Sequence, residues 1–169
     1  MVSIRLAEKS DFDFFFQLKS EDFNVFWTGG ADKPILENIK SFFYSAIENQ
    51  NREECRKIYI IENENGEKVG HLYIIPNGEE YDLACAILSD YCGKGYARNA
   101  IKLGLEEGRK YGFKKMVGSI REDNIASMKA YTSCGIQVLD EYKNVFVPKL
   151  EREVKMYKVI YDYGTQIEE

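Results

Sequence analysis

The spacing of apolar residues in the first third of the chain predicts a strand followed by two helices. Residues 2–6 alternate between apolar and polar side chains, as in a strand with one buried face. Residues 12–20 carry aromatic side chains at helical spacing, and Ser10-Asp11 offers a cap before them. A second helix is predicted over residues 34–49, because Pro34 suits a first helical turn and apolar residues follow along one face.

Three large aromatic residues lie between these helices, in a stretch that ends in Thr28-Gly29-Gly30 and is predicted to be irregular: Phe23, Phe26 and Trp27. Aromatic side chains in such a loop either wall a cleft or cover the core. Both interpretations stay open from the sequence, and the first would place Phe26 and Trp27 against a substrate.

The rest of the chain is predicted to form three consecutive antiparallel strands, followed by alternating helices and strands. Strands are predicted over residues 56–61, 69–75 and 81–88, with hairpin signals at Asn65-Gly66 and Asn77-Gly78. A helix (96–111), a strand (114–120), a short helix (125–134) and two closing strands (136–147, 154–161) follow. The fold class is therefore α/β (α+β), with a mixed, mostly antiparallel sheet of about seven strands, about four helices and a single domain over residues 1–169.

Composition narrows the class of protein. The 169 residues are 44% apolar and 30% charged, which suits one domain with a dense core. Because no apolar run approaches the roughly 20 residues of a membrane span and no leader pattern is present, we expect a cytoplasmic protein without a membrane partner. A net charge of -5 disfavours nucleic acid. The four cysteines lack Cys-x-x-Cys spacing and the lone His71 lies in a strand, so we expect no metal.

Candidate chemistry gathers after the strand over residues 81–88. The turn Asp90-Tyr91-Cys92-Gly93-Lys94-Gly95-Tyr96-Ala97 opens directly into a helix. Glycines let the backbone approach a ligand, and the first amides of a helix point outward without internal partners, so this turn is predicted to hold a pyrophosphate. Asn124, Ser127 and Tyr131 share one face of the short helix and look toward the same crevice.

These two blocks resemble the signature of the GNAT superfamily of acyl-coenzyme A dependent N-acetyltransferases, in particular the ribosomal-protein alanine and spermidine acetyltransferase subgroup. Cys92-Gly93-Lys94-Gly95-Tyr96-Ala97 is similar to the family's Gln/Arg-x-x-Gly-x-Gly/Ala loop. The run from Asn124 to Tyr131, with Gly135 after it, is similar to the family's Asn-x-x-Ser-x-x-x-Tyr-x-x-x-Gly helix. The resemblance is specific over residues 81–135, where both blocks occur in the expected strand and helix context.

The resemblance implies that acetyl-CoA is the cosubstrate and that the sheet splays between its fourth and fifth strands. The pyrophosphate would bind the amides of Gly93 to Ala97 with Lys94 or Arg98 as charge partner, and the pantetheine arm would pair beside Ala86 to Leu88. The residues expected at the coenzyme are Ala86, Ile87, Leu88, Cys92, Gly93, Lys94, Gly95, Tyr96, Ala97, Arg98, Asn124, Ser127 and Tyr131. Cys92 departs from the family's Gln or Arg, and we expect this to weaken coenzyme binding modestly.

The resemblance also implies a mechanism in which the amine attacks the thioester directly and Tyr131 protonates the leaving thiolate. A protonated amine must first lose its proton, and Asp82 is the favoured base because it shares a strand face with the small Ala84 and Ala86. A solvated strand-end aspartate is an equally open interpretation of Asp82, and Glu79, Glu80 and Tyr81 are neighbouring substitutes.

The acceptor is expected to be a small-molecule or peptide primary amine. The acidic balance weakly favours a cationic acceptor such as a polyamine or an exposed N-terminus, and amino sugars remain open. The alternative function is a catalytically silent acyl-CoA-binding regulator that acts through a protein partner, for which Cys92 is the best support. The sequence is compatible with a homodimer and does not establish one.

Overall fold

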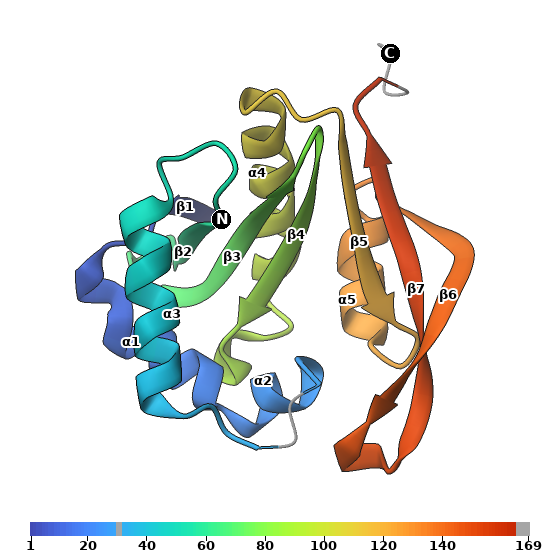
Figure 1. Cartoon of the computed structure of the whole chain (residues 1–169), viewed down its shortest axis with the longest axis horizontal. Coiled ribbons are helices and arrows are strands. Elements are labelled where there is room, and N and C mark those ends of the chain that lie inside the picture. The colour runs from blue at the N-terminus through green and yellow to red at the C-terminus, as the bar shows by residue number, and fades with distance from the viewer. Residues whose placement is uncertain (30–31, 165–169) are drawn as a thin grey trace.

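One mixed, twisted sheet organises the molecule (Figure 1). The computed structural model describes residues 1–29 and 32–164. In the described chain the strands are β1 (Val2–Leu6), β2 (Lys57–Asn63), β3 (Lys68–Asn77), β4 (Glu80–Ile87), β5 (Lys115–Arg121), β6 (Gln137–Val147) and β7 (Arg152–Asp162). Their order across the sheet is β1-β2-β3-β4-β5-β7-β6, and β4 and β5 are parallel while the other neighbours are antiparallel. The predicted fold class is confirmed.

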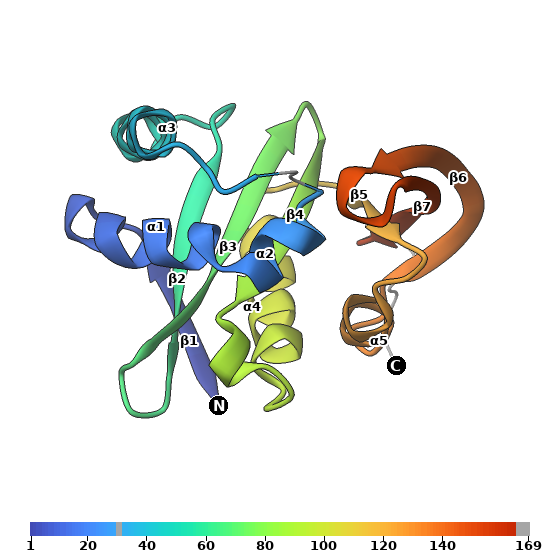
Figure 2. The same ribbon diagram turned by 90° about the horizontal axis from the view of Figure 1, so that it is seen from below.

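Helices cover both faces of the sheet (Figure 2). They are α1 (Phe12–Ser20), α2 (Asp22–Trp27), α3 (Leu36–Asn49), α4 (Tyr96–Lys110) and α5 (Ile125–Thr132), with short 3-10 turns at residues 9–11, 89–91 and 148–150. On one face α1 packs on β3 and α3 packs on β2, while on the other face α4 packs on β1, β3 and β4 with α5 beside it. The two faces therefore carry separate cores, and the face under α1 and α3 is the more aromatic.

The approach of α4 to β4 depends on two glycines. A Cβ atom at Gly108 would overlap the ring of Tyr81, and one at Gly104 would lie 2.7 Å from the Leu83 side chain. Because real side chains do not approach so closely, both positions need a residue without a Cβ atom. These contacts hold the second half of α4 against the first half of β4.

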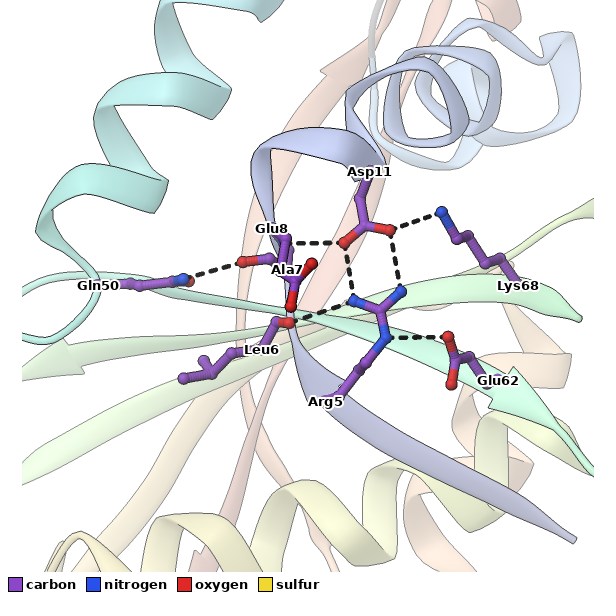
Figure 3. Close-up of polar contacts among 8 residues, drawn as sticks. All are labelled: Arg5, Leu6, Ala7, Glu8, Asp11, Gln50, Glu62 and Lys68. Atoms are coloured by element: carbon purple, nitrogen blue, oxygen red, sulfur yellow. Dashed lines mark hydrogen bonds and ion pairs between the residues drawn. The ribbon is translucent and has the colours of Figure 1, made fainter. Parts of the chain in front are cut away.

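A fully buried carboxylate ties β1 to the start of α1 (Figure 3). Asp11 accepts two hydrogen bonds from Arg5, of 2.8 and 3.0 Å, one of 2.8 Å from the Glu8 amide, and an ion pair of 2.7 Å from Lys68. Arg5 also donates to Glu62 at 2.9 Å. Burial alone would raise the pKa of Asp11, but the hydrogen bonds from Arg5 and Lys68 outweigh it and hold that pKa well below its ordinary value. We call Asp11, Arg5, Lys68 and Glu62 the Asp11 cluster.

Two local predictions differ from the structure. Residues 22–27, predicted to be irregular, form α2, and the buried Asn24 explains this because its amide donates to the Ile87 carbonyl of β4 at 3.2 Å. The third helix begins at Leu36 rather than at Pro34, after Ile35 in an extended conformation. Gly30 of the predicted loop lies outside the described residues. Within the part of the chain that is described, no helix is both long and apolar enough to cross a bilayer.

Candidate functional site

The two parallel strands at the centre of the sheet separate soon after they begin. β4 and β5 pair only at Glu80 with Lys115 and at Tyr81 with Met116, and beyond these pairs they diverge. The predicted splay is thus present, and it opens a gap between the β1–β4 and β5–β7 parts of the sheet. A cavity of about 520 Å³ lies at this gap, lined by residues of α2, β4, the glycine turn, α4 and α5.

Side chains from two helices cover carbonyls on the exposed edge of β4. The Tyr131 hydroxyl of α5 donates to the Leu83 carbonyl at 2.6 Å, and Asn24 of α2 donates to the Ile87 carbonyl. Alternate residues of a strand direct their backbone groups to the same edge, so the amide and carbonyl of Cys85 face the gap between these two bonds. Within the described chain neither group of Cys85 has a hydrogen-bond partner across the gap. This edge can accept a further extended chain.

The glycine turn presents free amides at the other end of the cavity. Gly93 and Gly95 both have φ of 78°, which other residues rarely adopt, and Gly95 is the N-cap of α4. The amides from Gly93 to Ala97 donate to no other group in the residues that the structure describes. Arg98 is exposed and lines the same cavity. Free amides at the positive end of a helix, with a guanidinium beside them, suit a phosphate ligand.

Two of the three residues predicted on the polar face of α5, Asn124 and Tyr131, already make hydrogen bonds within the protein. The Asn124 side chain caps the helix by accepting from the Ser127 amide at 3.1 Å, so its oxygen is engaged. The hydroxyl of Tyr131 is also engaged, since it donates its proton to Leu83. Burial raises the pKa of Tyr131 well above its ordinary value, and the nearby Cys85 and Asp82 add to this. The phenol is therefore held in its protonated form at the point where the strands part.

Most of the residues predicted to hold the coenzyme meet at this cavity. Eleven of the thirteen line it, namely Ala86, Ile87, Cys92, Gly93, Gly95, Tyr96, Ala97, Arg98, Asn124, Ser127 and Tyr131. The other two do not: Leu88 is buried, with its amide bonded to the Val69 carbonyl, and Lys94 places its ammonium 4.9 Å from the ring centre of Tyr91. Of the two predicted charge partners, only Arg98 is thus directed to the cavity.

Sequence reasoning missed several lining residues because their side chains reach the cavity through tertiary contacts. The clearest are Cys85 and the buried Asn24, neither of which belongs to the two motif blocks. Burial raises the pKa of the Cys85 thiol to about 12, which makes it a poor nucleophile. Phe23 and Trp27 also line the cavity.

The aromatic pair at the end of α2 is held by an arginine of β5. The guanidinium of Arg121 lies 4.9 Å from the ring centres of both Phe26 and Trp27 and donates to the Phe26 carbonyl at 2.9 Å. Asp123 accepts two hydrogen bonds from the same arginine. Of the predicted substrate walls, Trp27 lines the cavity whereas Phe26 packs on Arg121 outside it.

Asp82 lies on the opposite face of β4 from Cys85, the face of the sheet that carries α1 and α3, and it does not line the cavity. Its carboxylate packs against Gly118 of β5, where a Cβ atom would overlap it. Burial raises the pKa of Asp82, while the Leu83 amide and the Arg56 guanidinium oppose that rise. The carboxylate and the Tyr131 phenol therefore approach the start of the splay from opposite faces of the sheet. Among the described residues no group of three or more acidic, histidine or cysteine side chains could hold a metal ion.

Comparisons with known proteins agree with this geometry. A family model described as "Acetyltransferase (GNAT) domain" matches residues 2–137. A spermidine N-acetyltransferase from Vibrio cholerae, solved with CoA and spermine, is 14% identical and has a TM-score of 0.84 over 96% of each chain. A ribosomal-protein-alanine N-acetyltransferase from Brucella melitensis is 21% identical, with a TM-score of 0.77 over 95% of this chain and 99% of that one. An aminoglycoside acetyltransferase solved with coenzyme A is 15% identical, with a TM-score of 0.74 over 97% of this chain and 96% of that one. No curated protein matches the sequence.

Proposed function

The chain belongs to the acetyltransferase (GNAT) family, and we propose that it transfers the acetyl group of acetyl-CoA to a primary amine by direct attack. The observation that carries this proposal is the convergence at one cavity of the free amides of the glycine turn, the unpaired edge of β4 and the Tyr131 phenol. These three features match the pyrophosphate, the pantetheine amides and the thioester sulphur of one ligand.

Binding of the coenzyme would use backbone groups more than side chains. The amides of Gly93 to Ala97 and the guanidinium of Arg98 would hold the pyrophosphate. The free amide and carbonyl of Cys85 would pair with the pantetheine arm as with an added strand. Because the amides do most of this work, the exposed Cys92 in place of Gln or Arg is compatible with binding.

Tyr131 would act as the general acid. When the amine nitrogen bonds to the acetyl carbon, the carbon–sulphur bond breaks and the leaving thiolate needs a proton. The raised pKa of Tyr131, caused first by burial, keeps its phenol protonated until that moment. Its hydroxyl would exchange the Leu83 carbonyl for the sulphur as acceptor, a movement that a rotation about the C–O bond allows.

Asp82 would act as the base on the acceptor side. A primary amine has a pKa near ~10.4 and arrives as an ammonium, so one proton must leave before attack. The raised pKa of the Asp82 carboxyl, caused by burial, favours acceptance of that proton. The amine nitrogen loses two protons in all: the first passes from the ammonium to Asp82, and the second, lost as the amide forms, restores the Tyr131 phenol after it has protonated the thiolate.

The acceptor classes that follow from the sequence are polyamines, peptide N-termini and amino sugars. The names of two structural relatives, a spermidine and a ribosomal-protein-alanine acetyltransferase, support the first two. Trp27 would contribute an apolar wall to the site. A panel of these amines, scored by release of free coenzyme A, tests activity and distinguishes an enzyme from a regulator that binds the coenzyme without turnover.

The sharpest test of the mechanism is Tyr131→Phe with Tyr111→Phe as its matched control. Each change removes one tyrosine hydroxyl that makes a hydrogen bond, to Leu83 and to Tyr59 respectively, but Tyr111 does not line the cavity. We expect Tyr131→Phe to lower kcat about 100-fold while the Kd of acetyl-CoA, measured by calorimetry, stays within about threefold. Tyr111→Phe should retain kcat, and unchanged turnover in Tyr131→Phe would remove this residue from the mechanism.

A further inference from the structure

Two cations on the α1 and α3 face contact the same tyrosine ring. The Lys19 ammonium and the Arg56 guanidinium each lie 5.1 Å from the ring centre of Tyr73. Lys19 also lies 5.8 Å from the Phe15 ring centre, and Arg56 lies 5.0 Å from that of Phe42. The three side chains come from α1, the residue just before β2 and the centre of β3, and we call Lys19, Arg56 and Tyr73 the cationic cluster.

The two cations of this cluster form no ion pair inside the described chain. Neither Lys19 nor Arg56 has a carboxylate within ion-pair distance in the residues that the structure describes. Burial and the neighbouring Arg56 lower the pKa of Lys19 to about 8. The charged form of Lys19 is therefore less favourable in the folded protein than in water. Partly buried cations normally have an anionic partner, because their desolvation is otherwise uncompensated.

Polar atoms of the same cluster are also without partners. Tyr73 is 6% exposed, and its hydroxyl has no hydrogen-bond partner in the described chain. His71 stacks on Tyr73 at 4.4 Å, and neither of its ring nitrogens has a partner there either. Burial, with Lys19 and Arg56 nearby, lowers the pKa of His71 well below its ordinary value, so it is neutral and adds no charge. The Tyr73 hydroxyl is thus a buried donor without an acceptor in the described chain, on a ring that two cations contact.

The cluster lies on the side of the sheet that carries the proposed base. Tyr73 is paired with Ala84 in the sheet, two residues from Asp82 on the same strand face. The Arg56 guanidinium is near enough to lower the pKa of Asp82 against the effect of burial. A carboxylate at one point and two cations at a neighbouring point make a charge pattern complementary to a small zwitterion.

We infer that the acceptor is a small primary amine that also carries an anionic group, with its ammonium at Asp82 and its anion at Lys19, Arg56 and the Tyr73 hydroxyl. This inference rests on the proposed function and replaces the polycationic acceptor that the net charge favours. The carboxylate of an amino acid and the phosphate of an aminoalkyl phosphate share the chemistry that this site recognises. A diamine would place a second positive charge against Lys19 and Arg56.

Binding can be tested without turnover by calorimetric titration in the presence of coenzyme A. The probes are the standard amino acids, their methyl esters, 2-aminoethyl phosphate and cadaverine. We expect at least one anionic probe to bind about tenfold more tightly than cadaverine, and an amino acid that binds to exceed its own ester by the same factor. Binding by 2-aminoethyl phosphate alone would identify a phosphate as the anion.

Matched variants connect the preference to the cationic cluster. Arg56→Gln and Lys19→Gln should each remove most of the preference for the anionic probe, whereas Arg52→Gln, the same change at an exposed arginine outside the cluster, should retain it. Equal or better binding of esters and cadaverine, a preference that survives Arg56→Gln, or no binding of any anionic probe would overturn the inference. Anion-dependent binding without coenzyme A release from acetyl-CoA would instead refute the proposed function alone, and release with diamines only would refute this inference alone.

Discussion

Two groups of partly or fully buried charged residues lie on the same side of the sheet, and they differ in whether the protein supplies partners of opposite charge. In the Asp11 cluster, a fully buried carboxylate has three donors at 2.7 to 3.0 Å, and Glu62 pairs with Arg5, so that two anions balance the two cations Arg5 and Lys68. In the cationic cluster, two cations lie over one aromatic ring without a carboxylate at ion-pair distance in the described chain. Positive and negative charges are paired within the first group, whereas the second group contains cations without an ion-pair partner among the described residues.

The difference separates a structural role from a binding role. A buried charge whose partners are all supplied by the fold holds two elements together, here β1 and the turn before α1. A group of like charges weakens the fold, and the anionic ligand proposed above would supply the opposite charge. Three substitutions test this contrast through the free energy of unfolding, from the largest expected effect to the smallest.

Asp11→Asn should have the largest effect, because it leaves Arg5 and Lys68 without their shared anion. We expect the free energy of unfolding at pH 7 to fall by about 3 kcal/mol, measured by urea denaturation. The folded pKa of Asp11 is depressed, so its contribution is fully present above the unfolded value near ~3.9 and is lost as the pH falls below that value. The stability difference between the two proteins should therefore shrink below about pH 4, and a difference independent of pH would contradict this account.

Lys19→Met should have the opposite sign. Replacing a partly buried, uncompensated ammonium by an apolar chain of similar length should raise the free energy of unfolding by about 1 kcal/mol at pH 7. The folded pKa of Lys19, about 8, lies below that of the unfolded chain, so the charged form destabilises the protein until the pH rises above 8. The advantage of the variant should decrease between pH 8 and about pH 10.4, the unfolded lysine value. A loss of stability at pH 7 would show that Lys19 contributes to the fold and would weaken the contrast.

Glu62→Gln should have the smallest effect. Its partner Arg5 is bonded to Asp11 as well, and the Glu62 side chain is 24% exposed, so solvent replaces much of the lost interaction. We expect a decrease in the free energy of unfolding of about 0.5 kcal/mol or less. A decrease as large as that of Asp11→Asn would mean that the cluster depends on its periphery rather than on the buried carboxylate.

The fold and much of the geometry of the candidate site could be predicted because their signals are local. The turn at Gly93 and Gly95 and the cap at Asn124 depend on the conformational preferences of a few adjacent residues, and both occur as the sequence indicates. The helix α2 could not be predicted, because it is held by Asn24 against a carbonyl 63 residues away.

The sequence by itself determined the two motif blocks and the order of the elements other than α2, since backbone preference and apolar periodicity act over a single turn or strand. Only the tertiary structure decided where β4 leaves β5, that the Tyr131 phenol meets the Leu83 carbonyl, and that Lys19 and Arg56 converge on one ring. The physical reason is that strand register and helix docking bring together residues far apart in the chain. The cost of an uncompensated charge depends on those neighbours and not on the residue alone.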